Sequence, residues 1–390
     1  MTAEIRTGDE MNLEITPELA EVRSALRKFT REQLEPIALE IDKLGVIPER
    51  AWHLMRDAGY LGMQLPVEYG GGGFDMTTYC LALEEFSRSS RVFTMLLDYT
   101  SGLAPLGISR AGTPEQKAKY LPKLATGEWK AAFGLTEPGA GSDSAAISTS
   151  ARRVEGGWVL NGKKHYISGG NIADVVMVVT VTDAQKRARG GISTFLVDKG
   201  TPGFVVTRTD TTIGSDAIKL GELTFEDCFV PDNALLGELG GGFKIAMGSL
   251  TSGRLGVSCS CIGAADRMLE MAIGHAKERN TFGKPLADRQ AIQWMIADSA
   301  LEIQLARSLT YETLRRAQAG DDIGTSASMC KLYCSEMVGR VADRSVQIHG
   351  GMALMRGFNL ERFYRDIRHY RIGEGTSEVH RMLIARDLLK

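Results

Sequence analysis

The chain has 390 residues, of which 43% are hydrophobic and 24% are charged, the balance of an ordinary soluble globular protein. This length is too great for one compact core, so we expect two or three domains. The formal net charge of −2 provides no long-range attraction for nucleic acid or for anionic lipid, and we expect neither as a partner.

The sequence also bears on the cellular compartment. No apolar run approaches the roughly eighteen residues that spanning a bilayer requires. The polar, acidic segment Met1 to Glu14 lacks the apolar core of a secretion signal, and its acids argue against a mitochondrial transit peptide. The six cysteines have no CxxC pairs or adjacent histidines, so we expect buried, reduced thiols and no metal site. We expect an intracellular, cytoplasmic protein.

The first third of the chain has helical periodicity. Glu18 to Ile41 carries apolar residues with mostly helical spacing, and Thr16-Pro17 supplies an N-cap and a first-turn proline. Three further helical patterns follow: Pro48 to Ala58, Thr77 to Phe86, and Thr113 to about Thr126. We therefore expect a helical N-terminal domain over residues 1–128.

Near Trp129 the period changes to that of β-strands. Gly157 to Lys163 alternates and contains Asn161-Gly162, a strong signal for a hairpin turn. Four short strand patterns follow, separated by Gly, Pro and Asp: Val175–Val181, Ile192–Val197, Phe204–Thr207 and Glu222–Phe225. Short strands without intervening helices favour a small antiparallel barrel or sandwich, which we place in a middle domain over residues 129–235.

After Pro231 the pattern is helical again. Four segments have helical spacing: Lys244–Glu278, Ala287–Ala319, a stretch around Met329 to Val341, and Ser377–Leu389. Helices of this kind form a four-helix bundle, which we expect over residues 236–390. The order of helices, strands and helices has no strand–helix alternation and no internal repeat.

The segment Gly134 to Asp143 combines small residues, hydroxyls and a proline, so its backbone can approach a ligand closely and present N–H donors. Alone, it is equally compatible with a tight inter-domain turn. It resembles the first signature of the acyl-CoA dehydrogenase family. Further segments that resemble this family follow in the family's order: Tyr166–Ser168, Arg279–Gly283, Gln347–Gly351 running on to Arg365-Asp366, and Glu374–Glu378.

This resemblance covers the chain from about Thr16 and implies a fold and a chemistry. The implied fold is mostly α: an N-terminal helical domain, a middle antiparallel β-barrel and a C-terminal four-helix bundle. The implied activity is the FAD-dependent α,β-dehydrogenation of an acyl-CoA to the trans-2-enoyl-CoA. Electrons would pass to an electron-transfer flavoprotein, and a homotetramer, a dimer of dimers, is our working assumption.

The resemblance also assigns residues to the cofactor. It places Tyr166 against the flavin ring and the Ser168 hydroxyl at flavin N5, where an aromatic wall excludes water and a donor favours arriving hydride. The other flavin-side residues that it implies are Phe133, Leu135, Thr136, Gly141, Ser142, Ile167, Thr376 and Glu378. Arg279 and Phe282, with Gln290 in the same region, match residues that reach the FAD of a neighbouring subunit, and Gln347, Gly350 and Gly351 match adenosine-side contacts.

Glu374 is the predicted catalytic base. Removing a proton next to a carbonyl needs a carboxylate in a dry pocket, where burial raises its pKa. The start of the following helix lowers the pKa, so the net shift is open. In relatives, the backbone N–H of this glutamate helps to hold the thioester oxygen. A subset of the family carries its base one residue before the match of Arg254, but Gly253 cannot act as a base.

We expect Ser142, Arg254 and Gly375 to lie beside the substrate. Asp98 and Tyr99 fall in the stretch that tends to form the floor of the acyl pocket in the family; they are either ordinary structural residues or favour a polar or branched acyl group. The acyl group itself remains open. Other activities remain possible on the same fold: acyl-CoA oxidase, enoyl-thioester reductase or flavin monooxygenase. A non-catalytic assembly protein is the alternative of another class.

Overall fold

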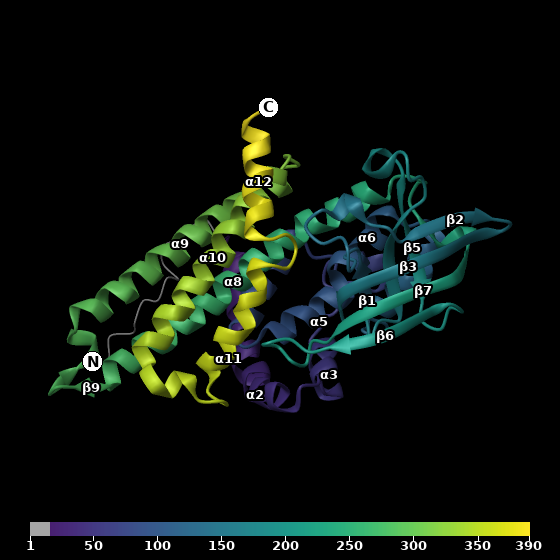
Figure 1. The fold of residues 1–390 in the computed structure, drawn as a ribbon. Coiled ribbons are helices and arrows are strands. Elements are labelled where there is room, and N and C mark those ends of the chain that lie inside the picture. Colours follow the sequence, from purple (N-terminus) through teal and green to yellow (C-terminus); the bar gives the residue numbers. More distant parts are fainter. Residues whose placement is uncertain (1–15) are drawn as a thin grey trace.

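The computed structural model describes residues 16–390, so the acidic segment Met1 to Glu14 lies outside the described residues. Helices from both ends of the chain lie beside one central sheet (Figure 1). The strands occupy one side of the molecule, and the long helices near the C-terminus occupy the other. The expected order of helical, β and helical parts is confirmed.

The N-terminal part consists of seven helices: α1 (Pro17–Phe29), α2 (Glu35–Leu44), α3 (Glu49–Asp57), α4 (Met76–Ser87), α5 (Arg91–Ser101), α6 (Leu103–Ala111) and α7 (Pro114–Ala125). The helical pattern expected over Glu18 to Ile41 is confirmed, with a π-helical turn at Thr30–Leu34 between α1 and α2. Pro36 has no N–H for a regular helical bond, which accounts for the change in the helix just before it.

The break between α5 and α6 matters for the cavity described below. Asp98 is in the last turn of α5, and its Oδ1 accepts a hydrogen bond from the Leu103 N–H at 3.2 Å. A Cβ at Gly102 would overlap this carboxylate oxygen. Glycine at the junction therefore lets the Asp98 carboxylate fold across the start of α6.

The middle part is an eight-stranded sheet whose strands are β1 (Ala131–Gly134), β2 (Ser150–Val154), β3 (Gly157–Ser168), β4 (Val175–Val181), β5 (Ile192–Asp198), β6 (Phe204–Asp210), β7 (Leu220–Pro231) and β8 (Leu235–Leu236). Their order is β6-β7-β3-β2-β4-β5-β8, and β1 pairs with β4. The pairings are antiparallel except for those of β4 with β1 and with β2, which are parallel; β4 pairs antiparallel with β5.

The turn expected at Asn161-Gly162 is wrong. Strand β3 continues through both residues with a register shift, and the turn lies earlier, at Glu155-Gly156 between β2 and β3. A Cβ at Gly162 would lie 2.6 Å from Thr149 Cα. Glycine is therefore needed there for close approach of two backbones and not for a turn.

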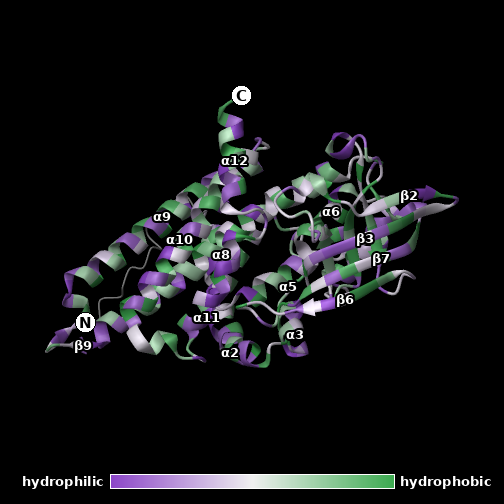
Figure 2. Ribbon diagram, in the orientation of Figure 1, coloured by the Kyte–Doolittle hydropathy of each residue, from purple (hydrophilic) through white to green (hydrophobic). Residues whose placement is uncertain are grey.

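The C-terminal part is a bundle of α8 (Gly242–Glu278), α9 (Gln290–Gln318), α10 (Gly324–His349) and α12 (Ser377–Leu388), with the shorter α11 (Asn359–Asp366). Strands β9 (Asn280–Thr281) and β10 (Lys284–Pro285) form a hairpin between α8 and α9. Figure 2 shows hydrophobic and hydrophilic residues mixed along each long helix, as expected where one face packs inward.

All six cysteines are free and buried, which confirms the expected thiols. Within residues 16–390, we find no helix that combines the length and the apolar character of a membrane span.

Candidate active site

One continuous cavity of about 1530 Å³ lies where the three parts of the chain meet. The structure brings twelve predicted site residues to its wall: Phe133, Leu135, Thr136, Gly141, Ser142, Tyr166, Ile167, Ser168, Arg254, Glu374, Gly375 and Thr376. Asp98 and Tyr99 line it as well. Residues far apart in the sequence therefore form one site. In the described part of the chain, no group of three or more His, Cys, Asp or Glu residues could hold a metal ion.

Glu374 lies in a turn with an unusual backbone. Its φ is +57° and that of Gly375 is +100°, and a left-handed conformation is uncommon for a residue other than glycine. The turn ends at Thr376, whose side chain accepts from the Val379 N–H at 3.2 Å and caps α12. Strained backbone of this kind persists only where the surroundings hold it in place.

Side chains of helix α10 bind this turn on both sides of Glu374. The buried Lys331 donates its ammonium hydrogen bond to the Gly375 carbonyl. Glu336, further along α10, accepts from Ser377 Oγ at 2.7 Å and forms an ion pair with Arg371 at 2.9 Å. The residues before, within and after the turn are thus all tied to one helix, which fixes the position of Glu374.

The Glu374 carboxylate is poised to take up a proton. Its Oε2 is enclosed and has no hydrogen-bond partner among the described residues. Burial, and next the negative charge of Asp98, raises the pKa of Glu374 to about 8, although Lys331, Arg254 and Arg91 act in the opposite direction. The direction of the Glu374 pKa shift, which the sequence left open, is therefore upward, because burial outweighs the start of the following helix.

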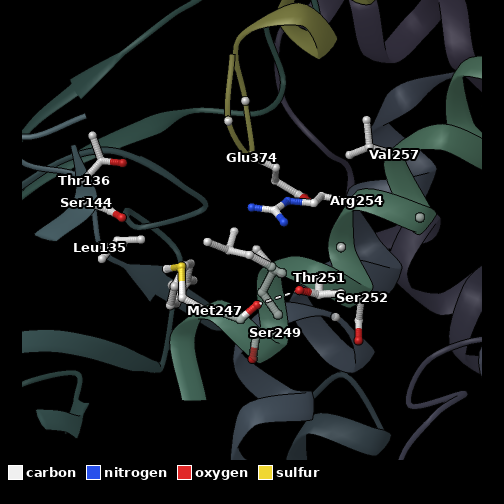
Figure 3. Close-up of a pocket in the computed structure, with 18 of the residues that line it drawn as sticks. Leu135, Thr136, Ser144, Met247, Ser249, Thr251, Ser252, Arg254, Val257 and Glu374 are labelled. Atoms are coloured by element: carbon white, nitrogen blue, oxygen red, sulfur yellow. Dashed lines mark hydrogen bonds between the residues drawn. The ribbon is translucent and has the colours of Figure 1, made fainter. Parts of the chain in front are cut away.

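Helix α8 forms the side of the cavity next to this carboxylate. Figure 3 shows Glu374 and Arg254 approaching each other and pointing into the cavity, across from Leu135 and Thr136. A Cβ at Gly253 would overlap Glu374 Oε2 and lie 2.9 Å from its Cδ. The missing side chain at position 253 therefore provides the space that the Glu374 carboxylate occupies.

A buried ion pair supports the opposite wall. Glu137 Oε1 lies 2.7 Å from Lys164 Nζ, and Lys164 also donates to the Leu135 carbonyl at 3.0 Å. Glu137 accepts from Ser148 and from the Thr149 N–H as well. Burial favours the protonated acid, but Lys164 and these donors outweigh it and lower the pKa of Glu137 to about 2. The pair fixes the backbone of the loop after β1.

This wall offers what a flat aromatic cofactor needs. Tyr166 stacks on His165 with ring centroids 3.8 Å apart, yet 59% of its surface is exposed beside the cavity. A Cβ at Gly141 would meet nothing within 4 Å, so a ligand can approach that backbone. Hydroxyls at Thr136 and Ser168 add polar groups to the wall. An aromatic surface, open backbone and hydroxyl groups fit a flavin ring.

Seven other predicted cofactor residues do not line this cavity. Glu378 is exposed in the first turn of α12. The remaining six, Arg279, Phe282, Gln290, Gln347, Gly350 and Gly351, lie around the β9–β10 hairpin and the end of α10. We call these six the distal cluster. Its two segments are adjacent, because Ile348 and Leu286 belong to one apolar cluster and His275 stacks on His349.

The distal cluster lies far from the cavity within one chain. Figure 1 places β9 at the opposite end of the bundle from the sheet. Phe282, at the tip of the hairpin, is 99% exposed. The cofactor roles of these residues, and that of Glu378, stay predictions.

Sequence reasoning missed several residues that shape the site. Lys331 and Glu336 bind the turn that contains Glu374. Lys164 and Glu137 form the ion pair behind the opposite wall of the cavity. A lysine on the otherwise apolar and small-residue face of α10 is the one available signal for Lys331. Arg91, which also lines the cavity, was not singled out.

Comparisons with known proteins agree with this geometry. Three domain families match consecutive parts of the chain: "Acyl-CoA dehydrogenase, N-terminal domain" over residues 16–128, the "middle domain" over 132–228 and the "C-terminal domain" over 240–389. The chain is 39% identical to the acryloyl-CoA reductase (NADH) of Anaerotignum propionicum, over 97% of this chain and 96% of that protein.

Solved structures give the same result. Butyryl-CoA dehydrogenase from Megasphaera elsdenii superposes with a TM-score of 0.92 at 34% identity, covering 97% of this chain and all of that one. A chain in the structure described as "Electron transferring flavoprotein of Acidaminococcus fermentans: Towards a mechanism of flavin-based electron bifurcation" gives 0.93 at 36% identity, with 97% of this chain and all of that chain covered.

The buried ion pair generates a testable prediction. Lys164→Met should lower the free energy of unfolding by about 3–5 kcal/mol, because it leaves the Glu137 charge buried without its partner. Lys163→Met is the matched control: this neighbouring lysine is exposed, and its replacement should change the value by less than about 0.5 kcal/mol. Chemical denaturation measures both. Equal effects of the two variants would contradict the assigned role of the pair.

Proposed function

The chain belongs to the acyl-CoA dehydrogenase family, and we propose that it catalyses α,β-dehydrogenation of an acyl-CoA with Glu374 as the base. The observation that carries this proposal is the Glu374 carboxylate itself. It is enclosed, has an unpartnered Oε2 and a raised pKa, and lines the same cavity as the loop after β1. A carboxylate in this setting can accept a proton at a pH near neutrality.

We propose FAD as the cofactor on the wall opposite Glu374. FAD, when bound, takes the hydrogen that leaves the substrate Cβ as a hydride. Phe133, Leu135, Thr136, Tyr166 and Ser168 would hold its ring, since together they provide the aromatic surface and the hydroxyls described above. The buried pair of Glu137 and Lys164 supports this wall from behind, so the protein need not reorganise when the ring is bound.

The residues of the chain would carry out proton transfer, stabilisation of the thioester oxygen and substrate binding. Glu374 accepts the proton from the substrate Cα as the Cα–Cβ double bond forms. The backbone N–H of Glu374 donates no backbone hydrogen bond within residues 16–390, which leaves it available to the thioester carbonyl oxygen. A donor at that oxygen stabilises the negative charge that develops during proton removal. We assign Arg254, Gly375 and Ser142 to the substrate because they line the same space.

We also propose that a second copy of the chain completes the cofactor site. The residues predicted to bind FAD separate into the cavity wall and the distal cluster, at two ends of one chain. Arg279 is exposed, and a forked guanidinium suits a pyrophosphate. A homotetramer would supply such a neighbour, and its mass can be measured by light scattering.

The electron acceptor is proposed to be an electron-transfer flavoprotein. This rests on the similarity to the chain from the Acidaminococcus fermentans structure. Thioester reduction is a second candidate, since the chain is 39% identical to an acryloyl-CoA reductase. In that direction Glu374 would return the proton to Cα. Anaerobic bleaching of the bound flavin by a saturated acyl-CoA, compared with its reoxidation by the enoyl-CoA, distinguishes the two directions.

Glu374→Gln tests the base. The amide is nearly isosteric but cannot accept the proton, so turnover should fall by about 10²–10⁴-fold. The variant should remain yellow, because the cofactor wall is untouched. Anaerobic flavin bleaching by acyl-CoA gives the rate, and the absorbance spectrum gives the flavin content. Full turnover in this variant would remove the proposal.

Gly253→Ala tests the space beside the base. The new Cβ overlaps the Glu374 carboxylate, and displacement of a catalytic group by about 1 Å can reduce turnover by about 10²-fold. Gly248→Ala is the control, since Gly248 lies on the same helix and a Cβ there meets nothing within 4 Å. Steady-state kcat should fall in the first variant and stay within about twofold in the second.

The pH profile tests the electrostatics of the base. Glu374 must be deprotonated to act, so kcat/KM should rise through a pKa of about 8 and level off above it. The Asp98 charge raises this pKa, so Asp98→Asn should move the acid limb to lower pH. Asn keeps an acceptor for the Leu103 N–H. Asp143→Asn, at the exposed side of the cavity, should leave the limb in place.

A further inference from the structure

One face of α5 forms the inner end of the cavity. Arg91, Thr94, Met95 and Asp98 all line it, and their spacing of three, four and seven residues places them on the same side of the helix. Arg91 is two helical turns from Asp98, which is about 10 Å along the helix axis. Apolar and aromatic side chains line the same cavity, among them Tyr79, Leu83, Val257 and Tyr370.

Arg91 has no anionic partner in the described part of the chain. Its Nε is enclosed and makes no hydrogen bond. Its Nη2 lies 3.8 Å from the Met95 sulfur, so the guanidinium lies along α5 beside the next helical turn. No carboxylate of the described residues lies within the 4.0 Å of an ion pair with this half-buried guanidinium.

The neighbouring acids have other partners. Asp98 accepts from the Leu103 N–H at the start of α6. Asp366 lies 3.6 Å from Arg362 and accepts from the Ser215 N–H. His369 bonds through Nδ1 to the Asp366 carbonyl at 2.9 Å, and burial, then Arg91, lowers its pKa well below the usual range. Arg91 acts to lower the pKa of Asp98 and of Asp366, against the larger effect of burial, but neither carboxylate forms an ion pair with it among the described residues.

The charged groups that act most strongly on Glu374 are Asp98, Lys331, Arg254 and Arg91. Lys331 donates to the Gly375 carbonyl, whereas the Nε atoms of Arg254 and Arg91 have no hydrogen-bond partner among the described residues. A planar guanidinium can bind a carboxylate through two hydrogen bonds, so a carboxylate inside the cavity would give Arg91 the partner that it lacks.

We propose that the inner end of the cavity selects acyl groups that end in a carboxylate, with Arg91 as the residue that binds it. The substrate class is therefore the monothioester of a dicarboxylic acid. This inference rests on the proposed function, since it places the thioester end beside Glu374. A methyl-ended chain would instead enclose the Arg91 guanidinium without a partner, which disfavours its binding.

Affinity measured without turnover tests this directly. Holoenzyme carrying Glu374→Gln is titrated with pairs of thioesters of equal carbon number, glutaryl-CoA with pentanoyl-CoA, adipyl-CoA with hexanoyl-CoA and suberyl-CoA with octanoyl-CoA. The flavin spectrum reports binding. We expect the carboxylate-ended member of at least one pair to bind about tenfold or more tightly. Arg91→Met should abolish that preference, and Arg91→Lys should restore part of it.

Met95→Leu is the matched control, because it alters the same wall without changing its charge and should leave the preference intact. Equal affinity within every pair, or a preference that survives Arg91→Met, would overturn the inference. Failure of the proposed function looks different: no thioester would bleach the flavin of the wild-type holoenzyme, while the paired affinities would still report on Arg91.

Discussion

The structure depends on holding one carboxylate in a backbone conformation that is unfavourable for it. Glu374 has a left-handed φ beside a glycine that also has a positive φ, and this arrangement survives because α10 fixes both sides of the turn through Lys331 and Glu336. A turn free to relax would move the carboxylate by more than the distance over which proton transfer works. The long bundle helix α10 thus positions the candidate base through Lys331 and Glu336.

Burial of the same carboxylate sets its acidity. The start of α12 lies only three residues after Glu374 and favours the charged form, as do the three nearby cations. The raised pKa means that desolvation, with the charge of Asp98, outweighs all of them. A carboxylate with cations nearby can therefore keep a raised pKa, because the hydration that it loses on burial outweighs the attraction of those cations.

Short sequence motifs were enough to predict the segments that form the site. The sequence did not predict features that depend on contacts between distant parts of the chain. The segments around Thr136, Tyr166 and Glu374 meet as expected, because each motif has a local form that the fold only has to bring together. The Asn161-Gly162 turn was misplaced, since pairing of β3 with β7 overrides a local turn preference. Lys331 and Arg91 could not be identified from the sequence, because the role of a lysine or arginine on a helix depends on whether the folded chain brings a partner next to it.

The residues proposed for proton and hydride transfer and the residues proposed to select the acyl group consequently lie on different structural elements. In the proposed mechanism, the turn at Glu374 and the wall after β1 position the reacting atoms, whereas α5 would contact the acyl group. Arg91 and Asp98 are two turns apart on that helix, and Asp98 is the only one of the two that is tied to a neighbouring backbone group within the described residues. Substitutions near position 91 can therefore alter the preferred acyl end without disturbing the base, while changes at position 98 alter both. Coupling between the two functions would pass through Asp98, because its charge acts on Glu374 and its carboxylate joins α5 to α6.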